Sequence, residues 1–207
     1  IWERDLAADS VSEIPFEAIV SIPGADYEKR DYDFDSTVSR QATILTPQIS
    51  PDGESIIFVA LGDVWHMNIG DDPVKVTDDE FHDVDPVFSP DGSTIAWASD
   101  RAGTQDIYTR NLETGEEKVI TTLLGAEVSP AFSPDGSQLA FQDQDGATYL
   151  LNLENNEVRE LIPAIFGPGR PSWSPDGETI TLAAVKVYSE RFREGTSQIL
   201  TVNVESG

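Results

Sequence analysis

The tetrapeptide Ser-Pro-Asp-Gly occurs four times in this chain and constrains its fold more than any other feature. The copies begin 39, 44 and 41 residues apart, and each lies between two apolar segments. Pro presets φ for a turn, the Asp carboxylate can cap backbone N–H groups, and Gly takes a positive φ, so each copy predicts a hairpin turn. The turn residues singled out are Asp52, Gly53, Asp91, Gly92, Asp135, Gly136, Asp176 and Gly177.

The segments after each turn repeat with the spacing of strands. Apolar residues stand three and five positions after each Gly, as Ile95 and Trp97 do after Gly92. This spacing puts both side chains on one strand face, so Trp97, Phe141 and Trp173 are expected in the core. A third strand, such as 107–112, and a short fourth follow. Units of four antiparallel strands with a period of about 40 residues predict an all-β propeller.

The repeat predicts an incomplete propeller segment of about four and a half blades within a single domain, 1–207. Its ends are unclosed, which exposes strand edges to pairing. We therefore expect contact with the remainder of the propeller, or self-association through the open blade edges. The chain is expected to begin with a half blade over 1–20, whose second strand lies at 13–20, followed by an acidic insertion over 21–41. Four blades are then expected over 43–77, 85–121, 129–162 and 171–207. The last of these blades lacks its fourth strand and contains an insertion at 186–195.

The chain is strongly acidic, with 38 Asp and Glu against 13 Lys and Arg and a formal net charge of −25. Nucleic acids and anionic membrane surfaces need a cationic face, so neither is an expected partner. No apolar run approaches 18 residues, so we expect no membrane insertion. The charge fits either a highly soluble surface suited to a salty medium or a dedicated cation site.

The cation candidates are His82, Asp83 and Asp85, which the pattern places together in the loop just before a first blade strand. Their carboxylates suit Ca²⁺ better than Zn²⁺, which prefers more histidine. The alternative is that both Asp residues cap turns and His82 is an exposed loop residue. The acidic run from Asp31 does not match a calcium-binding EF-hand, because Ser36 stands where that loop needs Gly. No other cofactor is expected.

No catalytic centre is evident in the sequence. The Gly-x-Ser-x-Gly elbow of serine hydrolases does not occur, and the chain has only two histidines, His66 and His82. Asp100 and Arg101 follow a blade strand and are expected to fix its loop through a salt bridge and hydrogen bonds. We therefore predict that this chain contains no catalytic residues.

The segment 88–101, Phe-Ser-Pro-Asp-Gly-Ser-Thr-Ile-Ala-Trp-Ala-Ser-Asp-Arg, resembles the repeat of TolB-like propellers. Related repeats occur in the tricorn protease and in prolyl oligopeptidase-type enzymes. The segments 13–18, 50–53 and 60–65 together resemble the N-terminal propeller of secreted metal-dependent amidohydrolases. That resemblance implies a C-terminal amidohydrolase barrel as partner and a periplasmic or secreted location. The barrel's metal-binding His-x-His signature does not occur in this sequence.

Two functions are open at this point. The first is a non-catalytic propeller domain of a larger hydrolase, an amidohydrolase by resemblance, that acts in substrate access or assembly. The alternative is a stand-alone TolB-like scaffold of the cell envelope that binds a protein or peptide.

Overall fold

The computed structural model describes residues 2–5, 9–13, 43–189 and 194–207. The chain divides into two compact units, Ile1–Arg40 and Gln41–Gly207. Across the described residues, no helix is long and apolar enough to cross a membrane.

The described residues of the first unit form an antiparallel hairpin. β1 (Trp2–Asp5) pairs with β2 (Ser10–Glu13), and Trp2 lies opposite Glu13. The sequence pattern placed the start of the second strand at residue 13, but β2 begins at Ser10. The earlier start follows from Asp9, whose φ of 47° turns the chain directly into β2. Residues 14–20 and the expected insertion over 21–41 lie outside the described residues.

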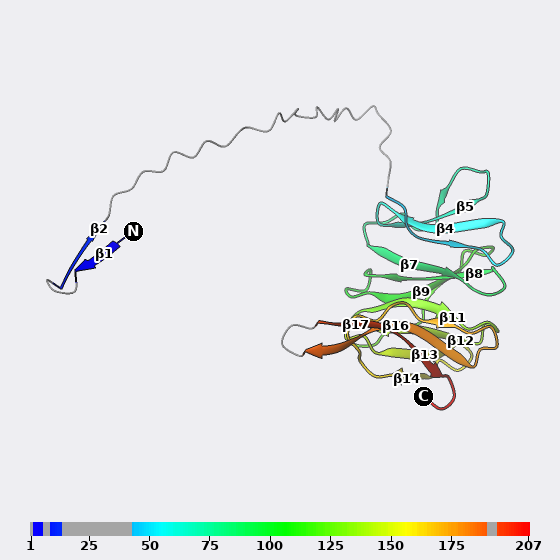
Figure 1. Ribbon diagram of the computed structural model, residues 1–207. Coiled ribbons are helices and arrows are strands. Elements are labelled where there is room, and N and C mark those ends of the chain that lie inside the picture. The colour runs from blue at the N-terminus through cyan, green and yellow to red at the C-terminus, as the bar shows by residue number, and fades with distance from the viewer. Residues whose placement is uncertain (1, 6–8, 14–42, 190–193) are drawn as a thin grey trace, which may run out of the picture. The chain divides into compact units, whose positions relative to one another are not determined.

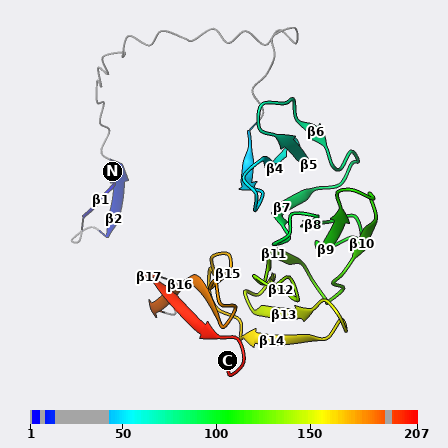
Figure 2. The ribbon, with the colours of Figure 1, turned by 90° about the vertical axis from the view of Figure 1, so that its right-hand side faces the viewer.

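The second unit consists of four antiparallel sheets that follow one another in chain order (Figures 1 and 2). The predicted fold class, a partial all-β propeller, is confirmed. The strands are β3 (Leu45–Ile49), β4 (Ser55–Ala60), β5 (Asp63–Asn68) and β6 (Val74–Lys75) in blade 1; β7 (Asp83–Phe88), β8 (Thr94–Ser99), β9 (Asp106–Asn111) and β10 (Glu117–Val119) in blade 2; β11 (Glu127–Phe132), β12 (Gln138–Asp143), β13 (Thr148–Asn152) and β14 (Val158–Ile162) in blade 3; and β15 (Ser172–Trp173), β16 (Thr179–Ser189) and β17 (Glu194–Asn203) in blade 4.

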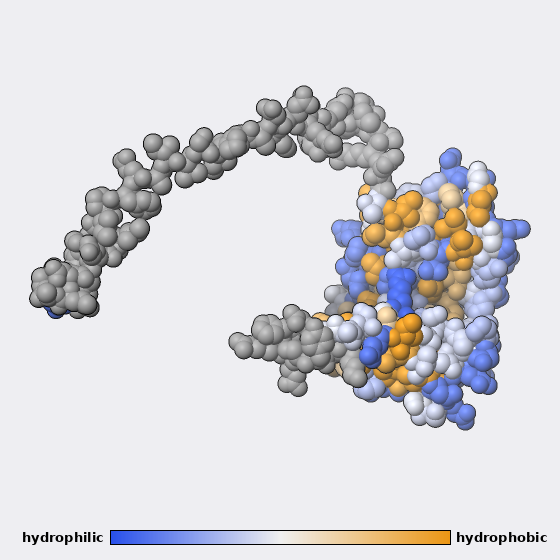
Figure 3. Space-filling view, viewed as in Figure 1, coloured by the Kyte–Doolittle hydropathy of each residue, from blue (hydrophilic) through white to orange (hydrophobic). Residues whose placement is uncertain are grey.

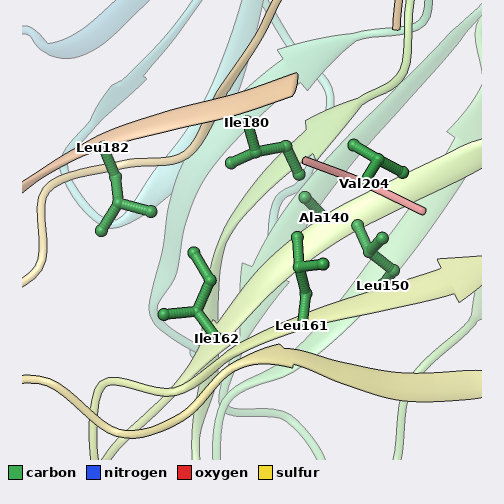
Figure 4. Packing of buried hydrophobic residues seen from close by; sticks show 7 residues of the cluster. All are labelled: Ala140, Leu150, Leu161, Ile162, Ile180, Leu182 and Val204. Atoms are coloured by element: carbon green, nitrogen blue, oxygen red, sulfur yellow. The ribbon is translucent and has the colours of Figure 1, made fainter. Parts of the chain in front are cut away.

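The core lies between successive blades. Trp97 of β8 packs with Ile57 of blade 1, and Phe141 of β12 packs with Ala98 of blade 2. Both aromatic side chains are fully buried. Trp173 is partly buried and packs against the hydrophobic cluster between blades 3 and 4. The prediction that Trp97, Phe141 and Trp173 are core residues is therefore confirmed. That cluster fills the space between blades 3 and 4 (Figure 4) and consists of Ala140, Leu150, Leu161, Ile162, Ile180, Leu182 and Val204.

Blade 4 differs from the others in its second and third strands. β16 and β17 remain paired as far as Ser189 opposite Glu194, so the expected insertion at 186–195 extends an existing hairpin. Residues 190–193, which complete its turn, are not among those described. The hydropathy surface of the second unit is mixed, with apolar patches lying between hydrophilic residues (Figure 3).

Candidate functional site

The first strands of the four blades, β3, β7, β11 and β15, lie next to one another and are called the inner strands. A residue followed by proline stands at the same place in each blade: Thr46, Asp85, Ser129 and, just ahead of β15, Arg170. Thr46, Asp85 and Ser129 have φ values of 47°, 57° and 56°, and the strand register shifts at each. Non-glycine residues with positive φ are strained and concentrate at functional sites, so these bulges are candidate site positions.

Three of these residues, Asp85, Ser129 and Arg170, interact and are called the inner-strand cluster. The Arg170 guanidinium donates to Asp85 Oδ1. The backbone N–H and the hydroxyl of Ser129 donate to Asp85 Oδ2, each over 3.2 Å. The Asp85 carboxylate of blade 2 therefore forms hydrogen bonds with both blade 3 and blade 4. The Arg170 side chain is 38% exposed against 17% for Asp85, so the guanidinium remains open to solvent.

A hollow of about 510 Å³ is lined by the inner strands of all four blades. Its lining is mainly proline and apolar side chains, among them Phe88, Phe132 and Trp173, and within the described structure Arg170 supplies its charge. A hollow that combines apolar side chains with a guanidinium at its wall suits a segment with an apolar side chain and a carboxylate, because guanidinium and carboxylate form charge-assisted, bidentate hydrogen bonds.

His82, Asp83 and Asp85 were the metal candidates, and in the structure each has different partners. Asp83 and Asp85 lie within β7, not in the loop before it, and Asp85 belongs to the inner-strand cluster. His82 is exposed, and its backbone N–H donates to Asp100 Oδ1 over 2.8 Å. The described residues contain no group of three His, Cys, Asp or Glu side chains placed to hold a metal ion.

Asp83 can occupy a buried strand position because nearby donors satisfy one of its oxygens. Trp97 Nε1 donates to Asp83 Oδ1 over 3.2 Å, and the Arg101 guanidinium lies 3.4 Å from the same oxygen. Arg101 also pairs with Glu117 and stacks over the Tyr108 ring at 4.7 Å. Arg101 thus fixes the loop after β8 through ion pairs, hydrogen bonds and ring contacts together.

The four Ser-Pro-Asp-Gly turns share one hydrogen-bond pattern. In the third turn, Ser133 Oγ donates to Asp135 Oδ1 over 2.6 Å. The same oxygen also accepts a hydrogen bond from the backbone N–H of Ser137. Asp52, Asp91 and Asp176 have the same contacts, and Gly53, Gly92, Gly136 and Gly177 have φ between 72° and 76°. The hydrogen bond from the serine hydroxyl is the main cause that lowers the pKa of each of the four carboxyls. The turns therefore serve structure.

Replacing Asp135 with alanine is expected to lower the free energy of unfolding by about 1 kcal/mol at pH 7, the net worth of a lost hydrogen bond. Because folding lowers the pKa of this carboxyl, its charge-dependent contribution is complete above the unfolded pKa and is lost as pH falls through the lower folded pKa. Urea unfolding at pH 7 and pH 3 measures the change. Asp72→Ala, at an exposed position without a side-chain hydrogen bond in the described structure, is the control. Equal losses for both variants at pH 7 would contradict the prediction.

Thr46, Ser129 and Arg170 were not among the site residues predicted from the sequence. A signal for them exists, because each precedes a proline that stands four residues before the proline of the next Ser-Pro-Asp-Gly turn. That repeat marks the inner strands, but the contact of Asp85 with Arg170 joins residues 85 positions apart and needs the blade arrangement to be known.

The family model described as the TolB beta propeller domain (PD40) matches residues 70–207. A Bacillus subtilis (strain 168) protein named Uncharacterized peptidase YuxL is 35% identical over 131 residues, which cover 55% of this chain and 19% of that protein. The matched part thus spans about a fifth of this relative's length.

Two solved structures illustrate the fold. TolB from Acinetobacter baumannii superposes with a TM-score of 0.63 at 23% identity, over 78% of this chain and 43% of that one. A Mycobacterium tuberculosis puromycin-hydrolyzing peptidase gives 0.61 at 16% identity, over 79% of this chain and 28% of that one. At 23% and 16% sequence identity, these superpositions show that the folds are similar and nothing further.

Proposed function

Since this chain belongs to the TolB beta propeller family, we propose that it is the non-catalytic propeller domain of a larger hydrolase, specifically a peptidase. The observation that carries this proposal is the 35% identity to peptidase YuxL over 131 residues. The superposition on a puromycin-hydrolyzing peptidase supports the same architecture. In this proposal the rest of the propeller and a hydrolase domain are the partners of the segment, which has a role in substrate access or assembly.

The inner-strand cluster is the part of the segment that we assign to substrate access. Its arginine lines the hollow formed by all four inner strands, where apolar side chains are also exposed. A peptide with an apolar side chain and a free C-terminal carboxylate matches both features of this hollow.

An amidohydrolase remains the second candidate, favoured by the likeness of segments 13–18, 50–53 and 60–65 to the propellers of those enzymes. The relative reported above is a peptidase, so we rank the peptidase first. A periplasmic or secreted location, and self-association through open blade edges, remain predictions of the family resemblance and of the open-ended repeat.

The two hydrolase classes differ in substrate and in metal dependence. The whole protein, produced from its complete reading frame, is assayed on short peptide amides and on cyclic and N-acyl amides, with and without a metal chelator. We expect peptide hydrolysis that survives chelation. Hydrolysis of the other amides that is lost on chelation supports the amidohydrolase. Absence of any hydrolysis, with capture of a peptide or protein partner, supports the stand-alone scaffold.

Arg170→Ala in the whole protein is expected to raise KM about tenfold for peptides with a free C-terminal carboxylate, the cost of one charge-assisted contact of about 1.4 kcal/mol. The same peptides with an amidated C-terminus should show an unchanged KM, because they lack the recognised charge. Lys118→Ala, which removes an exposed cation paired with Glu116, is the control variant. An equal rise in KM for both peptide forms would contradict the assignment of Arg170.

A further inference from the structure

Buried acidic residues occur at equivalent places in two successive blade interfaces. The backbone N–H of Asp83 donates to the carbonyl of Gly62, the residue before Asp63. In the next interface the backbone N–H of Glu127 donates to the carbonyl of Gln105, the residue before Asp106. All four acidic residues are buried, so each interface brings the first residue of an inner strand to the first residue of the preceding blade's third strand.

The first interface supplies a cation for each acid. Lys75 Nζ lies 2.8 Å from Asp63 Oδ2, and the Arg101 guanidinium lies 3.4 Å from Asp83 Oδ1. Cations next to buried carboxylates offset part of the cost of removing those charges from water.

The second interface lacks both cations. Val119 takes the place of Lys75, since Val119 pairs with Tyr108 as Lys75 pairs with Trp65. After β12 the loop 144–147 contains no basic residue, whereas Arg101 stands in the corresponding loop after β8. Among the described residues, no lysine or arginine forms an ion pair with Asp106 or Glu127.

Glu127 is fully buried, and only one of its oxygens has a clear partner. The Thr121 hydroxyl donates to Glu127 Oε2 over 2.9 Å, while Oε1 has no hydrogen-bond partner that the described structure defines. Asp106, which is 5% exposed, interacts with this carboxyl from β9. Two ionised carboxylates without a cation are costly at such a place, and a single proton lets one carboxyl donate to the other.

We propose that Asp106 and Glu127 share one proton, and that this proton stabilises the interface between blades 2 and 3. The proton takes the place that Lys75 and Arg101 occupy in the preceding interface. The site is therefore proton-sensitive: loss of the proton leaves two buried negative charges that repel each other across the interface.

The surrounding groups support this assignment. Burial, the largest cause, and Asp106 both raise the pKa of Glu127, while the Thr121 hydroxyl and the Leu123 backbone N–H lower it, and the net result is a pKa of about 7. Asp143 lies opposite Glu127 in the strand register, and its carboxylate accepts from the N–H groups of Asp145 and Ala147 and the Tyr149 hydroxyl. Asp143 therefore adds a further negative charge on this side and no proton donor for Glu127.

The direction of the pH effect follows from linkage. Folding raises the pKa of this carboxyl, so the folded form binds the proton more tightly than the unfolded form. The stabilisation is complete below the unfolded pKa of 4.5 and is lost as pH rises towards about 7. This is opposite in sign to the effect expected for the Ser-Pro-Asp-Gly aspartates.

The test compares the wild-type chain with Glu127→Gln, whose amide can accept from Thr121 and donate to Asp106 but has no proton to lose. Relative to this variant, the unfolding equilibrium constant of the wild type is expected to rise about tenfold per pH unit above pH 5, or about 100-fold by pH 7. Glu157→Gln, at an exposed position, is the matched control and should keep the wild-type profile. A Glu127→Gln profile parallel to the wild type would overturn the proposal.

A second measurement needs no variant. In wild-type protein with carbon-13-labelled glutamate side chains, one carboxyl signal is expected to titrate near pH 7. The titration is repeated with added Ca²⁺. If every glutamate titrates below pH 6, the shared proton is excluded. If stability at pH 8 also depends on Ca²⁺, a bound cation takes the place of the proton.

Discussion

Replacing Gly146 with alanine is expected to destabilise the second unit by roughly 3 kcal/mol or more, or to prevent its folding. Gly146 has a φ of 87°, which costs other residues about 1–3 kcal/mol. An added Cβ would also overlap the backbone carbonyl oxygen of Ile165, which cannot rotate away as a side chain can. The Ile165 backbone N–H donates to the Gly146 carbonyl over 3.3 Å, so relief of the overlap disturbs the loop into blade 4 as well.

Gly103 provides the matched control for this prediction. It occupies the corresponding turn of blade 2 with a φ of 113°, but an added Cβ there meets nothing within 4 Å. Gly103→Ala should therefore lose only the conformational part, about 1–2 kcal/mol. Urea unfolding followed by far-UV circular dichroism measures both variants. Equal losses would show that the close approach to Ile165 does not constrain the turn.

Trp97→Ala is expected to reduce the free energy of unfolding by about 3–5 kcal/mol, the range for removal of a large buried aromatic side chain. Trp97 is fully buried between blades 1 and 2, and its ring stacks on Tyr108 with centroids 6.1 Å apart. The substitution also removes the indole donor to Asp83, whose other oxygen has no hydrogen-bond partner among the described residues. The loss therefore combines a cavity with a less satisfied buried carboxylate.

Trp97→Phe separates the two contributions. Phenylalanine fills much of the space but offers no N–H to Asp83, whose Oδ1 then keeps, within the described structure, only the contact with the Arg101 guanidinium, so the expected loss is about 1–3 kcal/mol. Both variants are measured by urea unfolding at pH 7. A loss for Trp97→Ala no larger than that for Trp97→Phe would contradict the assignment of Trp97 as a packing residue.

The fold could be predicted because its information is local and repeated. Each Ser-Pro-Asp-Gly turn fixes a hairpin, and the spacing of two after each turn, as at Ile95 and Trp97, identifies the strand face that packs against the neighbouring blade. These patterns depend on residues only a few positions apart.

The sites were harder to predict, because their residues come together only when the blades stack. Asp83 and Glu127 look like loop residues by polarity, yet both are buried at the start of inner strands, where partners from a neighbouring blade or loop interact with them. Asp85 was one of the metal candidates from the sequence, and the structure shows that its carboxylate contacts Arg170, 85 residues away. The contrast between Lys75 and Val119 becomes meaningful only when the strand register aligns them.

The central claim is that this segment is the non-catalytic propeller of a larger hydrolase, and histidine chemistry offers the most direct test. His66 and His82 are the histidines of the sequence given, and histidine is the commonest acid–base group in enzymes. The measurement is peptide hydrolysis by the whole protein with both His66→Gln and His82→Gln. The account predicts a kcat within about twofold of the wild type, since the reacting groups lie elsewhere. A loss of a hundredfold or more in a variant that still folds, or no hydrolysis by the wild type, would contradict it.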